Sequence, residues 1–157
     1  MKQILIIFTT LMLGLTLHGQ VKPYDEQANA MEQISTAVAQ AQAQQKYVIC
    51  QVGGNWCPWC RRFSHLKDTC AEVRQIIEKN FVYVHINYSK ENKNLDAMKR
   101  LGNPGRFGYP AFVILDGEGK VMHIQNSEYL EENKGYSVKK IVKFLTLWTP
   151  EAVNRIE

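Results

Sequence analysis

Residues 52–60 read Val-Gly-Gly-Asn-Trp-Cys-Pro-Trp-Cys, and this stretch decides how the rest of the chain is interpreted. Before it, residues 47–52 are dense in β-favouring side chains, which predicts a buried strand that ends at the two glycines. After it, Pro58 suits the first turn of a helix, and a helical pattern continues to Lys79 with a break at residues 68–70. The two cysteines therefore lie where a strand passes into a helix.

This position favours redox chemistry at the two sulfurs. Unpaired amide groups and the helix dipole stabilise negative charge at a helix N-terminus, and such surroundings lower a cysteine pKa from about 8.5 to about 3.5–7.5. We expect Cys57 to face solvent and attack as the thiolate, and Cys60 to face inward and resolve the mixed disulfide that results. The sulfurs alone carry this exchange, so no cofactor is expected.

A pair of cysteines at this spacing has three alternative roles in proteins. Covalent haem attachment needs a histidine directly after the second cysteine, and position 61 is arginine. A zinc site needs a second ligand pair at short spacing. No such pair is formed by Cys50, Cys70, His65 and His85, so no metal is expected. A purely structural disulfide is the remaining alternative.

The rest of the chain alternates helical and strand patterns. Helices are predicted over residues 24–45, 95–101 and from Ser137 to near Pro150, and strands over residues 81–87, 111–115 and 120–125. Residues 116–119, Asp-Gly-Glu-Gly, predict a tight turn that joins the last two strands as a hairpin. The fold class is therefore α/β, with a mixed, mostly parallel central sheet, an antiparallel hairpin edge and flanking helices.

The N-terminus has the pattern of a secretory signal peptide. Lys2 precedes the apolar run of residues 4–17, which is shorter than the roughly 20 residues of a membrane span. We expect cleavage after Gly19, which leaves one periplasmic or secreted domain, residues 20–157, with no stable membrane insertion; an uncleaved anchor is the alternative. The net charge of +4 comes from scattered basic residues, which argues against a nucleic-acid partner.

Two motifs together resemble the thioredoxin superfamily, in particular its exported members. The first is residues 52–60, and the second is residues 108–116, Gly-Tyr-Pro-Ala-Phe-Val-Ile-Leu-Asp, within a match over residues 46–148. The resemblance implies a thioredoxin fold and a protein disulfide oxidoreductase whose partners are protein thiols or disulfides and a further redox protein. A non-enzymatic binding module or chaperone with this fold is the alternative.

The resemblance also implies a substrate-binding surface of four residues. Pro110 would be a cis-proline that faces the disulfide and leaves the backbone at Tyr109 free to bond an extended substrate strand. Trp56 would shield one side of the sulfurs, and Trp59 would tune the reduction potential and the choice of partner. A trans-proline that opens an edge strand is the alternative at Pro110.

One position departs from the family pattern. Thioredoxin carries a buried aspartate six residues before the first cysteine, where it assists proton transfer at the inner thiol, and this chain has Gln51, which cannot titrate. Deprotonation of Cys60 must then depend on water or another group. Elsewhere, we expect Cys50 and Cys70 to be packing residues, with a bridge between them as the alternative.

Overall fold

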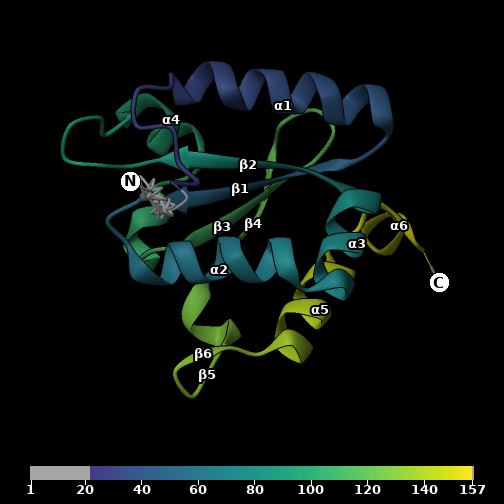
Figure 1. The fold of residues 1–157 in the computed structure, drawn as a ribbon. Coiled ribbons are helices and arrows are strands. Elements are labelled where there is room, and N and C mark those ends of the chain that lie inside the picture. The colour runs from purple at the N-terminus through teal and green to yellow at the C-terminus, as the bar shows by residue number, and fades with distance from the viewer. Residues whose placement is uncertain (1–21, 157) are drawn as a thin grey trace, which may run out of the picture.

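The computed structural model describes residues 22–156 and contains a four-stranded sheet with helices on both faces (Figure 1). The sheet order is β2-β1-β3-β4, with β1 at Tyr47–Gly53, β2 at Phe81–Asn87, β3 at Ala111–Leu115 and β4 at Val121–Asn126. These elements confirm the four predicted strands. The predicted signal peptide, residues 1–19, lies outside the described part of the chain.

Each face of the sheet has its own hydrophobic core. Helices α1 (Ala30–Gln44) and α4 (Leu95–Arg100) cover one face, and α2 (Pro58–Thr69), α3 (Ala71–Asn80) and α5 (Val138–Leu147) cover the other (Figure 1). Successive side chains of a strand point to opposite faces. Accordingly, Val48 and Cys50 pack in the first core, Tyr47 and Ile49 pack in the second, and β1 is buried along its whole length.

The sheet is mixed as predicted, but the expectation that it is mostly parallel is wrong. β1 pairs with β2 in parallel, whereas the β1–β3 and β3–β4 pairs are antiparallel. The sequence pattern suggested that the helix after β2 crosses back over the sheet, yet α4 has only 6 residues. The chain therefore enters β3 at the carboxyl end of β1, where Ala111 pairs with Val52.

The first helix is shorter than predicted. It begins at Ala30 rather than near residue 24, because the side chain of Asn29 accepts hydrogen bonds from the backbone N–H groups of Met31 and Glu32 and so caps it. The segment before it leaves the helix and brings Tyr24 to the disulfide, where this residue is 2% exposed. The predicted break at residues 68–70 is confirmed, since Cys70 separates α2 from α3.

Short elements complete the chain. The 3-10 helix η1 is Pro104–Phe107. The segment before α5 contains η2 (Ser127–Leu130) and a small hairpin of β5 (Glu131–Glu132) and β6 (Gly135–Tyr136). A further helix that was not predicted, α6 (Pro150–Asn154), follows α5 because Thr149 caps it and Pro150 fills its first turn. No helix within residues 22–156 has the length and apolar character to cross a membrane.

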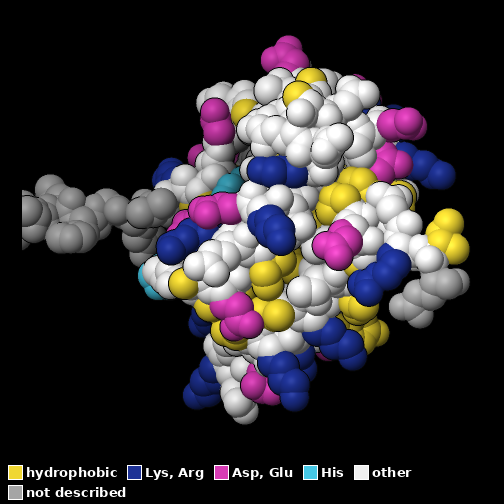
Figure 2. Space-filling view, turned by 90° about the vertical axis from the view of Figure 1, so that its right-hand side faces the viewer, with side chains coloured by type: hydrophobic (Ala, Val, Ile, Leu, Met, Phe, Trp, Pro, Cys, Tyr) yellow, Lys and Arg dark blue, Asp and Glu magenta, His cyan; other side chains and the backbone are white. Residues whose placement is uncertain are grey.

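The end of the molecule that carries α3 and α6 has a mixed surface. Figure 2 shows lysine and arginine side chains interleaved there with aspartate and glutamate, with apolar side chains between them. Nucleic-acid binding uses a patch or stripe of one sign. The face in this view has no such patch.

Candidate active site

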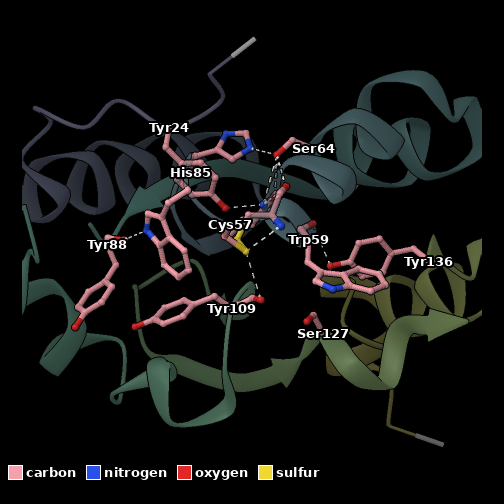
Figure 3. The surroundings of a disulfide bond; sticks show 12 residues. Tyr24, Cys57, Trp59, Ser64, His85, Tyr88, Tyr109, Ser127 and Tyr136 are labelled. Atoms are coloured by element: carbon pink, nitrogen blue, oxygen red, sulfur yellow. Dashed lines mark hydrogen bonds between the residues drawn. A yellow bond between two sulfur atoms is a disulfide. The ribbon is translucent and has the colours of Figure 1, made fainter. Parts of the chain in front are cut away.

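Cys57 and Cys60 form a disulfide where β1 passes into α2 (Figure 3), and their Cα atoms lie 5.2 Å apart. Cys57 is the N-cap residue of α2, and Pro58 occupies the first helical position. The backbone N–H of Cys60 donates to the Cys57 sulfur over 3.2 Å. The first sulfur thus lies where a helix N-terminus stabilises negative charge, as the strand-to-helix pattern predicted.

The exposure of the two sulfurs differs less than expected. Cys57 is 4% exposed and Cys60 is 0% exposed, so the order is right but Cys57 does not face open solvent. The side chains of Tyr24, Trp59 and Tyr109 pack around the pair. A partner must therefore approach Cys57 through a small opening between aromatic side chains.

A turn before β3 faces the disulfide from the opposite side. The Tyr109–Pro110 peptide bond is cis, as predicted, and the carbonyl oxygen of Tyr109 lies 3.5 Å from the Cys57 sulfur (Figure 3). Pro110 is buried and leads directly into β3. Since β3 pairs with β1, the sheet itself holds this turn against the cysteines.

The rings of Trp56, Tyr88 and Tyr109 contact one another, and we call them the outer aromatic group. Figure 3 shows Tyr88 and Tyr109 on the same side of the disulfide. The Trp56 and Tyr109 rings meet edge to face with centroids 5.5 Å apart, and the Tyr88 and Tyr109 rings stack at 5.3 Å. The indole N–H of Trp56 donates to the Tyr88 carbonyl oxygen over 2.8 Å. Trp56 nevertheless remains 53% exposed, and burial beside Tyr88 raises the pKa of Tyr109 to about 12.

The opposite flank carries Trp59. Its ring meets Tyr136 edge to face at 5.3 Å, and the Arg62 guanidinium lies 4.8 Å from the Trp59 ring centroid. The hydroxyl of Tyr136 donates to the Trp59 carbonyl oxygen over 3.3 Å. Arg62, one of two arginines that follow the motif, therefore supports the residue between the cysteines rather than the sulfurs directly.

Behind Cys60 lies a buried set of hydrogen-bonded side chains that we call the inner polar network. Its centre is Gln51, which is 0% exposed and whose amide nitrogen lies 2.6 Å from the Tyr24 hydroxyl and 3.0 Å from the Cys60 carbonyl oxygen. The hydroxyl of Tyr83 donates to the Gln51 amide oxygen. Ser64 completes the set: its hydroxyl lies 3.4 Å from Gln51 and 3.0 Å from the His85 ring nitrogen Nε2.

The ionisable members of this network are neutral near pH 7. Burial, with a smaller contribution from Lys67, lowers the pKa of His85 to about 4. Burial also raises the pKa values of Tyr24 and Tyr83 well above the usual range. Gln51 thus occupies the place behind the inner cysteine that the family resemblance indicated, and the groups around it carry no charge.

Several residues of the site were not predicted from the sequence. Tyr24 was predicted to lie in a helix, His85 was considered as a zinc ligand, and Ser64, Tyr83 and Tyr88 had no predicted role. Alternation along β2 gives the one local signal, because it places Tyr83 and His85 on the same face of the strand. Tyr24 gives none, since its partner Gln51 lies 27 residues away.

The two remaining cysteines are free rather than bridged. Cys50 is buried in the core beneath α1, where burial raises its pKa to about 12, and Cys70 packs partly buried between α2 and α3. Both are packing residues, as expected. Across residues 22–156, no cluster of three or more His, Cys, Asp or Glu side chains is arranged to hold a metal ion.

Comparisons with known proteins agree with this geometry. The sequence model of a thioredoxin-like family matches residues 29–117, which is more than half of the chain. A disulphide isomerase from Xylella fastidiosa Temecula1 is similar in structure, with a TM-score of 0.72 and 28% identity over 82% of this chain and 97% of that one.

A second solved structure, described as DsbH oxidoreductase, has a TM-score of 0.51 and 17% identity over 77% of this chain and 82% of that one, which shows a shared fold. No curated protein sequence matches the chain. The chain belongs to the thioredoxin-like family, and with its Cys57–Cys60 pair it is a protein thiol–disulfide oxidoreductase.

Proposed function

We propose that this protein is an exported enzyme that exchanges or reduces disulfides of other proteins, with Cys57 as the attacking sulfur and Cys60 as the resolving sulfur. The observation that carries the assignment of roles is the N–H of Cys60, which donates to the Cys57 sulfur at the start of α2. This contact favours a thiolate at Cys57. Cys60 is fully buried and suited only to attack from inside.

The reaction proceeds by two sulfur exchanges. The Cys57 thiolate attacks one sulfur of a substrate disulfide, a bond forms between Cys57 and the substrate, and the other substrate sulfur leaves as a thiolate. The Cys60 thiolate then attacks the Cys57 sulfur, which reforms the Cys57–Cys60 disulfide and releases the second substrate thiolate. Two electrons have passed to the substrate, and a dithiol redox partner protein must return them; the reverse sequence oxidises a substrate dithiol.

The substrate contacts are assigned to Trp56, Trp59, Tyr109 and Pro110. Their support is position: the Tyr109 carbonyl lies 3.5 Å from the Cys57 sulfur, the Trp56 ring contacts the Tyr109 ring, and Trp59 packs against the cysteine pair. An extended peptide that lies along the turn at Tyr109 would meet the backbone there as an added strand. The exposed Trp56 ring offers it an apolar face.

Export is proposed from the N-terminal pattern, with cleavage after Gly19 and action in the periplasm. The test is expression of the full chain in a Gram-negative host. We expect a soluble periplasmic protein whose first residue is Gln20 by mass spectrometry. A chain that stays in the membrane fraction with Met1 intact would instead establish an uncleaved anchor.

Insulin reduction with dithiothreitol as the electron source tests the activity. We expect the parent protein to accelerate reduction, Cys57→Ser to lose this activity entirely, and Cys60→Ser to accumulate a mixed disulfide with insulin. Cys70→Ser is the matched control, because Cys70 is a free and partly exposed cysteine away from the disulfide, and it should retain full activity.

The same variants separate the enzyme from a chaperone. If the parent protein does not turn over insulin and still binds unfolded clients after Cys57→Ser, the chain is a binding module. A measured reduction potential then gives the direction of the enzyme: a value near about −270 mV indicates a reductase, and one near about −120 mV indicates an oxidant.

A further inference from the structure

We infer that the hydroxyl group of Tyr24 donates a hydrogen bond to the Cys60 sulfur when the disulfide opens, and so stabilises the Cys60 thiolate. The inference rests on the proposed function and deepens it. It adds a catalytic residue to the site, at the inner sulfur, where Gln51 cannot act as an acid or a base.

The orientation of Gln51 determines what Tyr24 can do. The Cys60 carbonyl oxygen can only accept a hydrogen bond, and it lies 3.0 Å from one end of the Gln51 amide, so that end is the NH₂ group. The same nitrogen lies 2.6 Å from the Tyr24 oxygen. An amide NH₂ only donates, and therefore Tyr24 accepts this bond and its own hydrogen points elsewhere.

The position of Gly53 shows where that hydrogen can go. A Cβ atom added to Gly53 would overlap the Cys60 sulfur and lie 3.0 Å from the Tyr24 oxygen. The sulfur and the hydroxyl thus border the same small space, which the missing side chain of Gly53 leaves. Tyr24, Cys57 and Cys60 also form one buried cluster.

The Tyr24 hydroxyl is protonated and shielded from water. Tyr24 is 2% exposed, and burial raises its pKa far above neutral pH. Among hydrogen bonds within residues 22–156, none uses the Tyr24 hydroxyl as donor. His85, whose ring meets Tyr24 edge to face at 5.0 Å, is neutral because burial lowers its pKa to about 4.

A pair of backbone contacts holds Tyr24 in this place. The Tyr24 N–H donates to the Asn55 side-chain oxygen over 3.1 Å, and the Asn55 side-chain nitrogen donates to the Tyr24 carbonyl oxygen over 2.8 Å. Asn55 lies just before the cysteine motif. The segment that carries Tyr24 is therefore fixed directly to the loop that carries the sulfurs.

The donated hydrogen bond serves both directions of exchange. When a substrate thiolate attacks Cys57, the Cys57–Cys60 bond breaks and its electron pair stays on Cys60, which leaves as a thiolate that Tyr24 stabilises. When Cys60 resolves a mixed disulfide, the same hydrogen bond raises the thiolate fraction that can attack. Tyr24 keeps its proton throughout, so no other acid or oxidant is required.

The test uses reduced protein and 5,5′-dithiobis(2-nitrobenzoate) in a Cys70→Ser background, which removes the partly exposed free cysteine. Attack by Cys57 releases one nitrothiobenzoate, and attack by Cys60 on the mixed disulfide releases a second. For Tyr24→Phe we expect the second release to be about tenfold slower at neutral pH, with an apparent pKa about one unit higher. The first release should change less than twofold.

Two further variants test whether the effect comes from the Tyr24 hydroxyl itself. Tyr47→Phe is the matched control, because its hydroxyl also takes part in a hydrogen bond, with Asn154, but lies at the opposite end of β1 from the cysteines, and its second release should keep the parent's apparent pKa. Replacement of Tyr24 by 3-fluorotyrosine makes the hydroxyl a stronger donor, so the apparent pKa should fall. Thermal unfolding checks that each variant is folded.

Three outcomes overturn the inference: an unchanged second release in Tyr24→Phe, an equal shift in Tyr47→Phe, or a shift in the same direction for phenylalanine and fluorotyrosine. A parent protein without a second release overturns the proposed function as well. If the parent shows both releases and Tyr24→Phe matches it, only the inference fails.

Discussion

The two sides of the Cys57–Cys60 disulfide both use tyrosine, but they use different parts of it. In the outer aromatic group the rings of Tyr88 and Tyr109 stack on each other, and Trp56 beside them is 53% exposed. In the inner polar network the hydroxyls of Tyr24 and Tyr83 are the working groups, and both bond to the buried Gln51. The outer side exposes aromatic rings, and the inner side provides hydrogen-bond partners for buried polar groups.

Because of this difference, we expect the outer aromatic group to affect the binding of substrate and the inner polar network to affect the stability of the fold. An aromatic pair adds about 0.5–1.5 kcal/mol to stability beyond the contribution of the area it buries. Removal of an exposed ring therefore lowers the free energy of unfolding only a little. A buried polar group left without its partner costs about 1–3 kcal/mol. Changes to the inner network should therefore lower the free energy of unfolding, whereas changes to the outer group should mainly weaken the binding of substrate.

The largest expected effect is on the inner side. Gln51→Leu removes the amide that bonds to Tyr24, Tyr83 and the Cys60 carbonyl. The two tyrosine hydroxyls lose this partner, whereas the Cys60 carbonyl keeps its hydrogen bond from Ser64. We expect the free energy of unfolding, measured by urea denaturation, to fall by about 3–4 kcal/mol. The control Gln75→Leu, on the exposed face of α3, should change it by less than about 0.5 kcal/mol.

A loss below about 1 kcal/mol for Gln51→Leu would mean that water or rearranged side chains satisfy the network. The contrast between the two sides of the disulfide would then not hold for stability.

The next effect is a dependence of stability on pH. The His85 pKa of about 4 lies below the value of about 6.5 expected in the unfolded chain, so the folded state binds fewer protons between these values. Stability is therefore full above about pH 6.5, falls by about 2–3 kcal/mol as the pH drops toward 4, and loses nothing more from this group below that.

The measurement is the unfolding free energy across this pH range. His85→Gln should flatten the slope, because glutamine does not titrate. His65→Gln, at an exposed position of α2, should keep the parent slope. Equal slopes for the parent and His85→Gln would show that other groups cause the dependence.

The smallest effect is expected on the outer side. Trp56→Ala removes an exposed ring, so the free energy of unfolding should change by no more than about 1 kcal/mol while the KM for insulin rises about five- to tenfold. Release of nitrothiobenzoate should be unchanged, because this small reagent does not need the ring. Tyr129→Ala, at an aromatic residue that is 74% exposed, should leave KM as it is. Equal effects of both variants would remove Trp56 from the substrate surface.

Local pattern and the two motifs predicted most of the fold. The strand at 47–52 and the helix broken near Cys70 are present because the pattern of neighbouring residues determines each. The cis bond at Pro110 is also present, as the family resemblance implied. The direction of β3 was missed, since it depends on how far α4 extends over the sheet. Periodicity indicates that a helix exists but says little about the space it spans.

The candidate site divides in the same way. Both cysteines and Tyr109–Pro110 belong to short motifs, and the structure brings them together. The inner polar network joins β1, α2, β2 and the segment before α1, and no residue in it forms a motif with its neighbours. The sequence did indicate that a titratable group is missing, because Gln51 has an amide where the family has a carboxylate.

Tyr24 lies outside the segment that the family sequence model matches. The match to the family begins at residue 29, five positions after it. A protein that begins at residue 29 would keep both cysteines and the cis peptide bond, yet it would lack the hydroxyl beside Gly53 and Cys60. Rates measured on such a fragment would describe a different enzyme, because the boundary of a recognisable domain and the boundary of its active site do not coincide here.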